Sequence, residues 1–316
     1  MKNSLKEKYR RSLKSLDTEE HIDLFFYRPI GYCWAEISAR LGISPNALTI
    51  VAIILGISAG VLFYYPELRI NVIGMLLLVL ANTFDSADGQ LARLTKQYSR
   101  IGRILDGLCG DLWFITIYFA IIFREINFSD FFSTHPWAIW LLACTAGICH
   151  TKQAAMADYY RQFHLYFLKG NALNELESAD QLEKQLEESG ITWSNNFWKR
   201  LTMTFYLGYT RQQEATAPHM QDLRRELHRR YPDGNIPADF YDDVRSRSLP
   251  LMKYTNILSF NWRVITLFIT LFIGQPWLYF VAELTVFNGI LIYLVVTHER
   301  HCKALVRELD SHYSPQ

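Results

Sequence analysis

The sequence lacks the features that mark several common protein classes. Its 316 residues include only five cysteines, and none of them forms a C-x-x-C pair, which disfavours a disulfide framework and a zinc site. Lys and Arg number 32 against 31 Asp and Glu, so the chain has no basic excess of the kind that nucleic-acid-binding proteins show. The basic N-terminus is not followed promptly by a short apolar core with a small-residue cleavage site, so we expect no cleavable signal peptide.

Long apolar segments are what the sequence does contain. Half of the residues are hydrophobic, yet the mean hydropathy is close to zero, so very apolar stretches alternate with very polar ones. About twenty apolar residues cross the hydrocarbon core of a bilayer. Six segments approach this length: residues 46–65, 70–92, 101–123, 137–157, 257–273 and 277–297. We therefore predict an all-α integral membrane protein with six transmembrane helices.

The polar segments between these spans divide the chain into five predicted parts. They are 1–44, a basic N-terminus with a juxtamembrane amphipathic helix; 45–160, transmembrane helices 1–4; 161–255, a helical cytosolic insert; 256–298, transmembrane helices 5–6; and 299–316, a cytosolic tail. The insert contains an aromatic run with few charges. Its apolar side chains suit either the membrane interface or packing on other helices, and we expect packing: Phe197, Trp198, Leu201, Phe205 and Tyr206.

Basic residues predict the orientation of the spans. The N-terminus, the insert, the tail and the turn between spans two and three are rich in Lys and Arg, whereas the opposite loops carry only Arg69 and Arg124. Because cytoplasmic loops carry the excess of Lys and Arg, we expect both termini and this turn to be cytoplasmic.

The turn between spans two and three lies in an acidic stretch, "FDSADGQLARLTKQYSRIGRILDGLCGDLWF", residues 84–114. One carboxylate at the middle of a membrane helix costs on the order of 3 kcal/mol, so the four aspartates of this stretch require neutralisation. Asp85 and Asp88 share one helix face, and the short turn lets the next helix bring Asp106 opposite them. Carboxylate oxygens are hard ligands that suit Mg²⁺ or Mn²⁺, and two such ions about 4 Å apart would balance the charge.

The rest of the stretch suits a phosphorylated ligand. Gly89, Ala92 and Gly102 place small residues near the aspartates, which leaves room for a flat base or a diphosphate. Arg93 is placed to hold phosphate oxygens. We therefore expect these four residues to bind the phosphorylated ligand, which is called the donor below.

The spacing D-x2-D-G-x2-A-R-x8-G-x3-D resembles the signature of the CDP-alcohol phosphatidyltransferase family through its third aspartate. The resemblance implies transfer of a phosphatidyl group from a CDP-lipid, CDP-diacylglycerol, to the hydroxyl of a small polar acceptor, with release of CMP. It also implies a homodimer in the lipid bilayer, and six spans resemble the bacterial branch of the family, so we expect a bacterial inner membrane. The same motif serves donors such as CDP-ethanolamine or CDP-choline, and membrane carboxylates also mark divalent-cation transporters.

The fourth aspartate departs from the family signature. There it follows the third by four residues and acts as general base, whereas Asp111 follows Asp106 by five. On an α-helix this step leaves the two about 140° apart, against about 40° for four residues. We expect a π-bulge between them to restore Asp111 as a metal ligand and as the base. The alternatives are a structural Asp111, with His150 or Asp158 as base, and an inactive enzyme.

Two cationic residues near the predicted cytoplasmic ends of spans four and five are candidates for binding the acceptor. Lys152 and Arg263 suit an acceptor that carries a phosphate, such as inositol phosphate, or they snorkel to the interface or pair with acidic neighbours. Glu283 and Asn288 in span six are expected to form interhelical hydrogen bonds.

Overall fold

The chain is helical throughout the regular structure of its described part. The computed structural model describes residues 9, 12, 17–98, 100–169, 178–232, 234 and 236–311. Five helical segments among these residues are long and apolar enough to cross a membrane: Pro45–Leu62, Leu68–Thr95, Leu105–Phe128, Ala238–Phe272 and Leu278–Leu309. They overlap predicted spans one, two, three, five and six, and the segment Ala238–Phe272 begins inside the range predicted as the cytosolic insert. Predicted span four lies in the helix Pro136–Lys169, which is not among the five.

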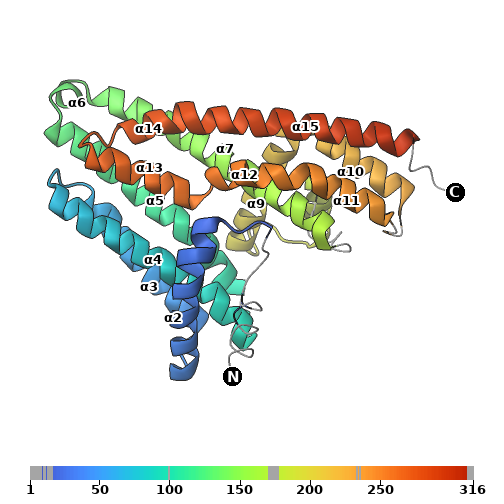
Figure 1. Ribbon diagram of the computed structural model, residues 1–316, viewed down its shortest axis with the longest axis horizontal. Coiled ribbons are helices and arrows are strands. Elements are labelled where there is room, and N and C mark those ends of the chain that lie inside the picture. The colour runs from blue at the N-terminus through green and yellow to red at the C-terminus, as the bar shows by residue number, and fades with distance from the viewer. Residues whose placement is uncertain are drawn as a thin grey trace. The chain divides into compact units, whose positions relative to one another are not determined.

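The chain divides into two compact units, and the first combines residues up to Cys149 with Phe260–Thr285. Its helices are η1 (Asp23–Tyr27, a π-helical turn), α2 (Arg28–Leu41), α3 (Pro45–Leu62), α4 (Leu68–Thr95), α5 (Arg100–Phe128), α6 (Asp130–Thr134), α13 (Phe260–Phe272) and α14 (Leu278–Ala282). The beginnings of α7 (Pro136–Lys169) and of the π-helical turn η4 (Glu283–Phe287) belong to it as well. Figure 1 shows α3 and α4 side by side.

Small residues bring α3 close to α5. Ser44 caps the N-terminus of α3 by accepting a hydrogen bond from Ala47 N at 3.3 Å, and Pro45 occupies its first turn. At Gly56 a Cβ would lie 2.1 Å from the indole Nε1 of Trp113, so only glycine fits there. That indole is 1% exposed and donates to the carbonyl of Ala52 at 3.1 Å. The close contact fixes α5 against α3 beside the acidic stretch.

The predicted juxtamembrane helix is present as η1 and α2, and α2 packs on α4. Gly31 makes the approach possible, because a Cβ there would lie 2.7 Å from Gln90 Oε1 and 3.0 Å from Ser86 Oγ. The helix ends at Gly42, which adopts φ 70°. Apolar residues point outward, with Phe25 83% and Leu41 69% exposed, as expected for a helix that lies at a membrane surface.

The second unit combines His150–Ser259 with the chain from Val286 onward. Besides the rest of α7, it contains α8 (Ala179–Glu188), α9 (Phe197–Thr216), α10 (Pro218–Arg230), α11 (Ala238–Ser248), η3 (Leu249–Leu251), α12 (Met252–Ile257) and α15 (Asn288–Ser311). The range of the predicted insert, 161–255, contains α8 to α11. The Glu299 carboxylate of α15 accepts from the N–H groups of His219, at 2.7 Å, and Met220, at 3.3 Å, in the first turn of α10. This contact joins the insert to α15.

The aromatic run of the insert is exposed, which corrects the prediction that it packs on other helices. Phe197 is 50%, Trp198 74%, Phe205 71% and Tyr206 50% exposed, whereas the buried residues of α9 lie further along the helix. The prediction was wrong because helical periodicity shows that a face is apolar, but not what covers it.

Candidate metal and phosphate site

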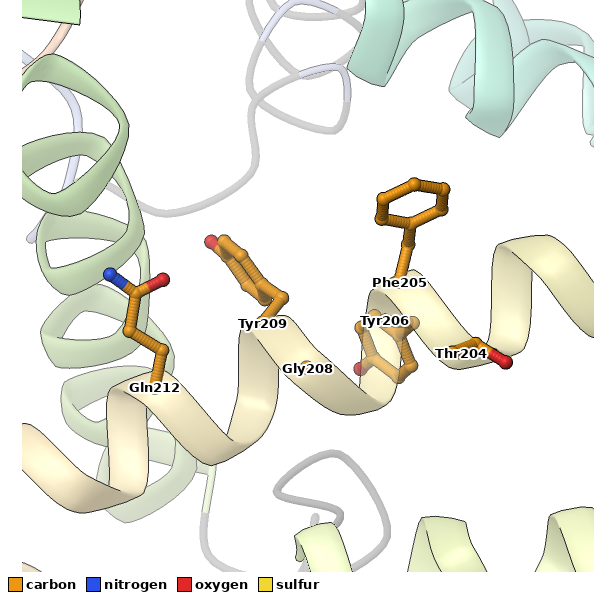
Figure 2. Close-up of a pocket in the computed structure, with 6 residues that line it drawn as sticks. All are labelled: Thr204, Phe205, Tyr206, Gly208, Tyr209 and Gln212. Atoms are coloured by element: carbon orange, nitrogen blue, oxygen red, sulfur yellow. The ribbon is translucent and has the colours of Figure 1, made fainter. Parts of the chain in front are cut away.

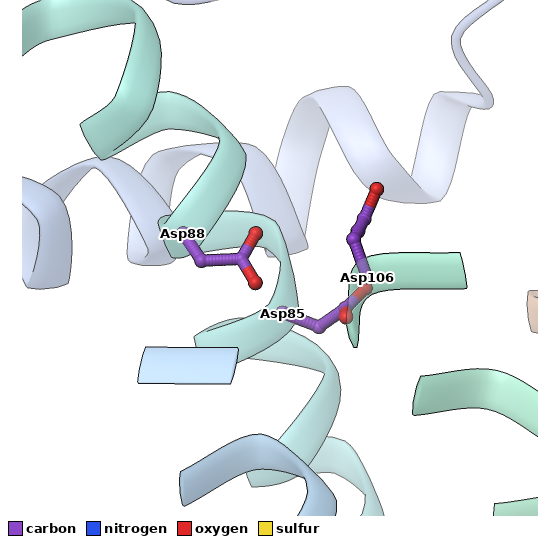
Figure 3. A group of neighbouring side chains, drawn as sticks. All are labelled: Asp85, Asp88 and Asp106. Carbon is purple, nitrogen blue, oxygen red and sulfur yellow. The ribbon is translucent and has the colours of Figure 1, made fainter. Parts of the chain in front are cut away.

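Three of the four predicted carboxylate ligands lie together in the first unit. Asp85 and Asp88, on α4, and Asp106, on α5, each offer an oxygen atom, and these atoms lie within 4.8 Å of one another. Figure 3 shows the three carboxylates converging from the two helices. Lys96 ends α4 with φ 56°, and α5 begins at Arg100, so a short turn brings Asp106 opposite the pair on α4. The spacing argument is therefore confirmed for these three residues.

The carboxylates differ in their surroundings. Asp88 is 5% exposed and accepts a hydrogen bond from the Thr49 hydroxyl, which α3 supplies. Asp106 is exposed, and Asp85 is partly buried. Asp85 Oδ1 is buried and has no hydrogen-bond partner among the described residues. A buried carboxylate oxygen without a donor is costly unless a cation neutralises it, so the oxygen-only donor set fits Mg²⁺ or Mn²⁺.

Arg93 lies one helical turn beyond the acidic pair, on the same helix. A Cβ at Gly89 would lie 3.3 Å from Arg93 Nη1, so the glycine gives the guanidinium its space. Arg93 Nε donates to the carbonyl of Ser12 at 2.5 Å, while its Nη2 is buried and lacks a partner in the described part of the chain. An unpaired guanidinium N–H near clustered carboxylates is suited to a phosphate oxygen. Among the other predicted donor-binding residues, Ala92 lies in the last turn of α4 and Gly102 in the first turn of α5.

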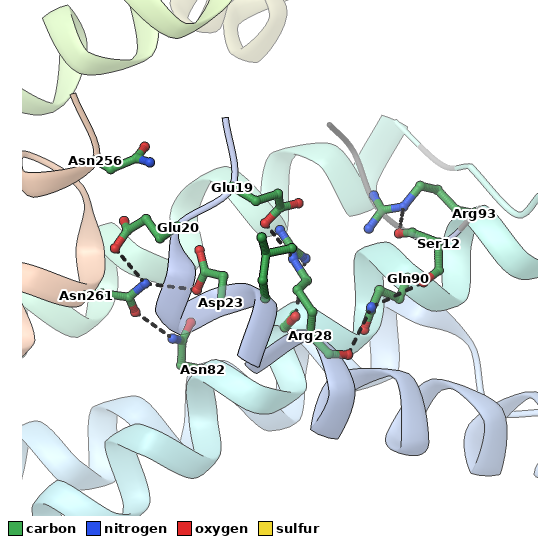
Figure 4. Close-up of polar contacts among 12 residues, drawn as sticks. Ser12, Glu19, Glu20, Asp23, Arg28, Asn82, Gln90, Arg93, Asn256 and Asn261 are labelled. Carbon is green, nitrogen blue, oxygen red and sulfur yellow. Dashed lines mark hydrogen bonds and ion pairs between the residues drawn. The ribbon is translucent and has the colours of Figure 1, made fainter. Parts of the chain in front are cut away.

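A polar network beside the site was not predicted from the sequence (Figure 4). Arg28, at the start of α2, donates to Glu19 at 2.9 Å and to the hydroxyl of Ser86 at 3.2 Å, and Ser86 directly follows Asp85. Gln90 donates to the carbonyl of Arg28 at 3.1 Å. The contacts therefore fasten the N-terminal segment over the acidic part of α4. In the sequence, Pro29 was the available signal for the start of this helix, but it does not identify the partners of Arg28.

A second part of this network reaches α13. Asn261 donates to Glu20 at 3.1 Å and to Asp23 at 2.9 Å, and its carbonyl oxygen accepts from Asn82 of α4 at 3.4 Å. Figure 4 shows Asn261 between the N-terminal segment and α4. One amide thus joins three segments that are distant in the sequence.

The predicted π-bulge in α5 is absent. The helix is α-helical from Arg100 to Phe128, and no neighbour lies within 4 Å of a Cβ placed at Gly107 or Gly110, so nothing forces an extra residue out of the helix. That prediction was wrong. Asp111 is exposed and is not one of the three clustered carboxylates. Its predicted roles as metal ligand and as base stay predictions.

The candidate acceptor residues have different surroundings. Arg263 is 1% exposed, and its Nη1 donates to both carboxylate oxygens of Glu283, at 2.5 and 2.6 Å. Glu283 thereby balances the charge of Arg263 inside the first unit, and Tyr279 donates to the same carboxylate at 2.6 Å. Lys152 lies on α7 in the second unit and is exposed.

Interhelical hydrogen bonds of Glu283 and Asn288 were predicted, and both are confirmed. Glu283 joins η4 to α13 through Arg263. Asn288 Oδ1 accepts from Gln153 Nε2 at 2.8 Å, which joins α15 to α7. Of the two bases considered in place of Asp111, Asp158 accepts from Gln162 at 2.7 Å, and both it and His150 lie on α7.

Comparison with known proteins identifies the stretch that holds the site. Residues 42–162 match the sequence profile of CDP-alcohol phosphatidyltransferases, and this range contains the three clustered carboxylates, Thr49 and Arg93. This match covers less than half of the 316 residues. The resemblance predicted from the spacing of the motif is thereby confirmed.

A curated relative of the phosphatidyltransferase domain is the archaetidylinositol phosphate synthase of Pyrococcus horikoshii, 35% identical over 83 residues. The similarity covers 26% of this chain and 43% of the relative, so the chain spans less than half the length of that protein. No solved structure shows significant similarity to the chain. Members of this family use divalent metal ions. Among the described residues, the three carboxylates of α4 and α5 are a group that could hold such an ion.

Proposed function

We propose that the protein is a membrane-embedded phosphotransferase that moves a phosphatidyl group from CDP-diacylglycerol to the hydroxyl of a small polar acceptor and releases CMP. The observation that carries the proposal is the cluster of Asp85, Asp88 and Asp106 inside the segment that matches the family. The unpartnered Arg93 Nη2 supports it, because the diphosphate of a CDP-lipid needs cationic donors as well as metals.

Each part of the site has a proposed task. The three carboxylates would hold one or two Mg²⁺ or Mn²⁺ ions, which, when bound, stabilise charge on the leaving phosphate. Arg93 orients the diphosphate, and Arg28, which is anchored by Glu19, supplies a second cation next to Ser86. Asp111 is the proposed general base, acting outside the three-carboxylate cluster. The burial of Asp88 and its bond from Thr49 keep its carboxylate oriented.

The acceptor we propose is inositol phosphate or a similar phosphorylated alcohol. The name of the P. horikoshii relative includes inositol phosphate, which supports this class of acceptor. Lys152 is the cation we assign to the acceptor phosphate, because it is exposed. Arg263 receives a structural task instead, because its guanidinium already pairs with Glu283, and Tyr279 donates to the same carboxylate.

We further propose six transmembrane spans, with the first half of α7 as the fourth. The apolar run of α7 ends at Cys149, after which His150, Lys152 and Gln153 follow, so the apolar part of this helix is shorter than that of its neighbours. The basic residues around the turn between α4 and α5 support a cytoplasmic site with cytoplasmic termini. A homodimer in a bacterial inner membrane remains part of the proposal.

Release of CMP by purified full-length protein tests the function. The assay pairs CDP-diacylglycerol with inositol phosphate, inositol, glycerol phosphate or serine, and a separate reaction pairs CDP-ethanolamine with diacylglycerol. We expect CMP only with Mg²⁺ or Mn²⁺, fastest with inositol phosphate, and none from Asp106→Asn. CMP release that is absent with every acceptor, or that is equal in wild type and Asp106→Asn, would refute the proposal. A raised KM for inositol phosphate in Lys152→Met tests the acceptor assignment.

A further inference from the structure

The second unit exposes a dense group of aromatic side chains at the beginning of α9. We call this group the aromatic face of α9, and it consists of five residues with their exposed fractions: Trp193 49%, Phe197 50%, Trp198 74%, Phe205 71% and Tyr206 50%. Scattered exposed aromatics are ordinary on a protein surface, but a contiguous group within fourteen residues of sequence marks an interaction surface.

The buried residues of the same helix lie further along it, and Tyr206, which precedes Gln213 by seven residues, is at the edge of the aromatic face. Leu207, Thr210 and Gln213 are the buried residues of α9, and they follow one another at the three-residue spacing of one helix side. Leu207 packs with Ala179 and Leu182 of α8. The helix is therefore held by its second half, while its first half carries the exposed aromatic face.

The outer side of α9 carries a shallow and open depression. A cavity of about 560 Å³ is lined by Thr204, Phe205, Tyr206, Gly208, Tyr209 and Gln212. Figure 2 shows Phe205, Tyr209 and Gln212 projecting from the same side of the helix. At Gly208 a Cβ would meet nothing within 4 Å, so the hollow lies between aromatic rings and is open beside them.

The anchoring of α9 gives its position along α7. Gln213 Nε2 donates to the carbonyl of Ala155 at 2.8 Å. Ala155 lies six residues beyond Cys149, where the apolar run of α7 ends, and six residues of α-helix span about 9 Å. The anchor of α9 therefore lies about 9 Å along α7 beyond the end of its apolar run, just past an interfacial layer of about 5–8 Å.

Two basic residues, Lys199 and Arg200, lie in the sequence between Trp198 and Phe205 of the aromatic face. Lys199 directly follows Trp198 and is exposed. Arg200 follows in turn, and its Nη1 donates to the carbonyl of Ile191 at 3.1 Å, which holds the loop before the helix in place. Trp and Tyr rings with adjacent Lys and Arg are the composition of interfacial membrane anchors.

We propose that the aromatic face of α9 docks in the headgroup region of the phospholipid bilayer, with Trp198 and Phe205 inserted and Lys199 facing anionic headgroups. The surface is separate from the carboxylate site of the first unit, so the inference goes beyond the proposed reaction. It gives the insert a second point of attachment to the membrane, apart from the spans. The result of the CMP assay has no bearing on it.

Photocrosslinking of the full-length protein in lipid nanodiscs tests the docking. A p-benzoylphenylalanine residue replaces Phe205 in one variant and Lys184 in the control, because the Lys184 side chain is 77% exposed on the neighbouring helix α8. After irradiation, mass spectrometry identifies the adduct. We expect phospholipid adducts at position 205, several-fold more abundant than at position 184. A yield of lipid adduct no greater than that of the control, or crosslinks mainly to a second copy of the chain, would overturn the proposal.

The role of the charge is tested in the same way. Lys199→Glu in the crosslinking variant should lower the lipid adduct several-fold in nanodiscs that contain phosphatidylglycerol, and less in nanodiscs of phosphatidylcholine alone. Lys184→Glu is the matched control, and it should leave the yield at position 205 unchanged. Equal effects of the two substitutions would show that net charge, and not docking of this face, determines the yield, which contradicts the proposed contact of Lys199.

Discussion

Removing the hydroxyl of Thr49 tests whether the site depends on a hydrogen bond that the motif does not contain. Thr49 is 2% exposed and donates to Asp88, which is 5% exposed, so no water replaces the donor in Thr49→Val. A hydrogen bond to a charged group contributes about 1.5–3 kcal/mol. At about 1.4 kcal/mol per tenfold change, this corresponds to roughly 10- to 150-fold. Loss of a partner that orients a metal ligand typically costs 10- to 100-fold in metal affinity or activity.

We therefore expect Thr49→Val to raise the Mg²⁺ concentration for half-maximal CMP release by about 10- to 100-fold, the cost of losing a partner that orients a metal ligand. High Mg²⁺ should restore most of the turnover, since all three carboxylates remain. Thr116→Val is the matched control, because the Thr116 hydroxyl donates only within its own helix, to the carbonyl of Leu112 at 2.8 Å. An unchanged Mg²⁺ dependence in Thr49→Val, or an equal shift in Thr116→Val, would refute the reasoning.

Three further predictions address the fold and the base. Arg263→Met should destabilise the protein by about 3–5 kcal/mol, because it leaves the buried Glu283 without a counter-charge, and Arg263→Met with Glu283→Gln should recover part of the thermal stability. Gly56→Ala should lower the midpoint of thermal unfolding, since its Cβ would lie 2.1 Å from an indole ring, whereas Gly289→Ala, with nothing within 4 Å, should not. Asp111→Asn should lower kcat by about 10²- to 10⁴-fold with an unchanged Mg²⁺ requirement. A raised Mg²⁺ requirement in that variant would instead make Asp111 a ligand.

Local spacing predicted the part of the site that depends on two adjacent helices. Asp85 and Asp88 are one helical turn apart, and a short turn determines where Asp106 lies, so elementary helix geometry was sufficient. Thr49 could not be assigned, because a hydroxyl inside an apolar span shows no partner until α3 packs on α4. The same holds for Asn261, whose partners lie more than 170 residues away.

Two errors have separate physical causes. The π-bulge was inferred from the family spacing, but glycines with open space around them let α5 continue as a regular helix. The aromatic run was expected to pack, although periodicity carries no information about whether protein or lipid covers an apolar face. The five helices that are long and apolar enough to cross a membrane follow from apolar length alone, whereas α7 combines an apolar half with a polar half and does not meet that criterion.

The ion pair of Arg263 and Glu283 has a consequence for how the chain enters its membrane. A lone charge inside a span costs up to roughly 3 kcal/mol during insertion, the value at the middle of the span, and here the two charges belong to successive helices, twenty residues apart in sequence. As the chain leaves the ribosome, α13 emerges with an unmatched cation, and its counter-ion follows only with η4. If these helices cross the bilayer as proposed, we expect them to enter it as one hairpin, and a nascent chain arrested before Glu283 should hold α13 at the translocon.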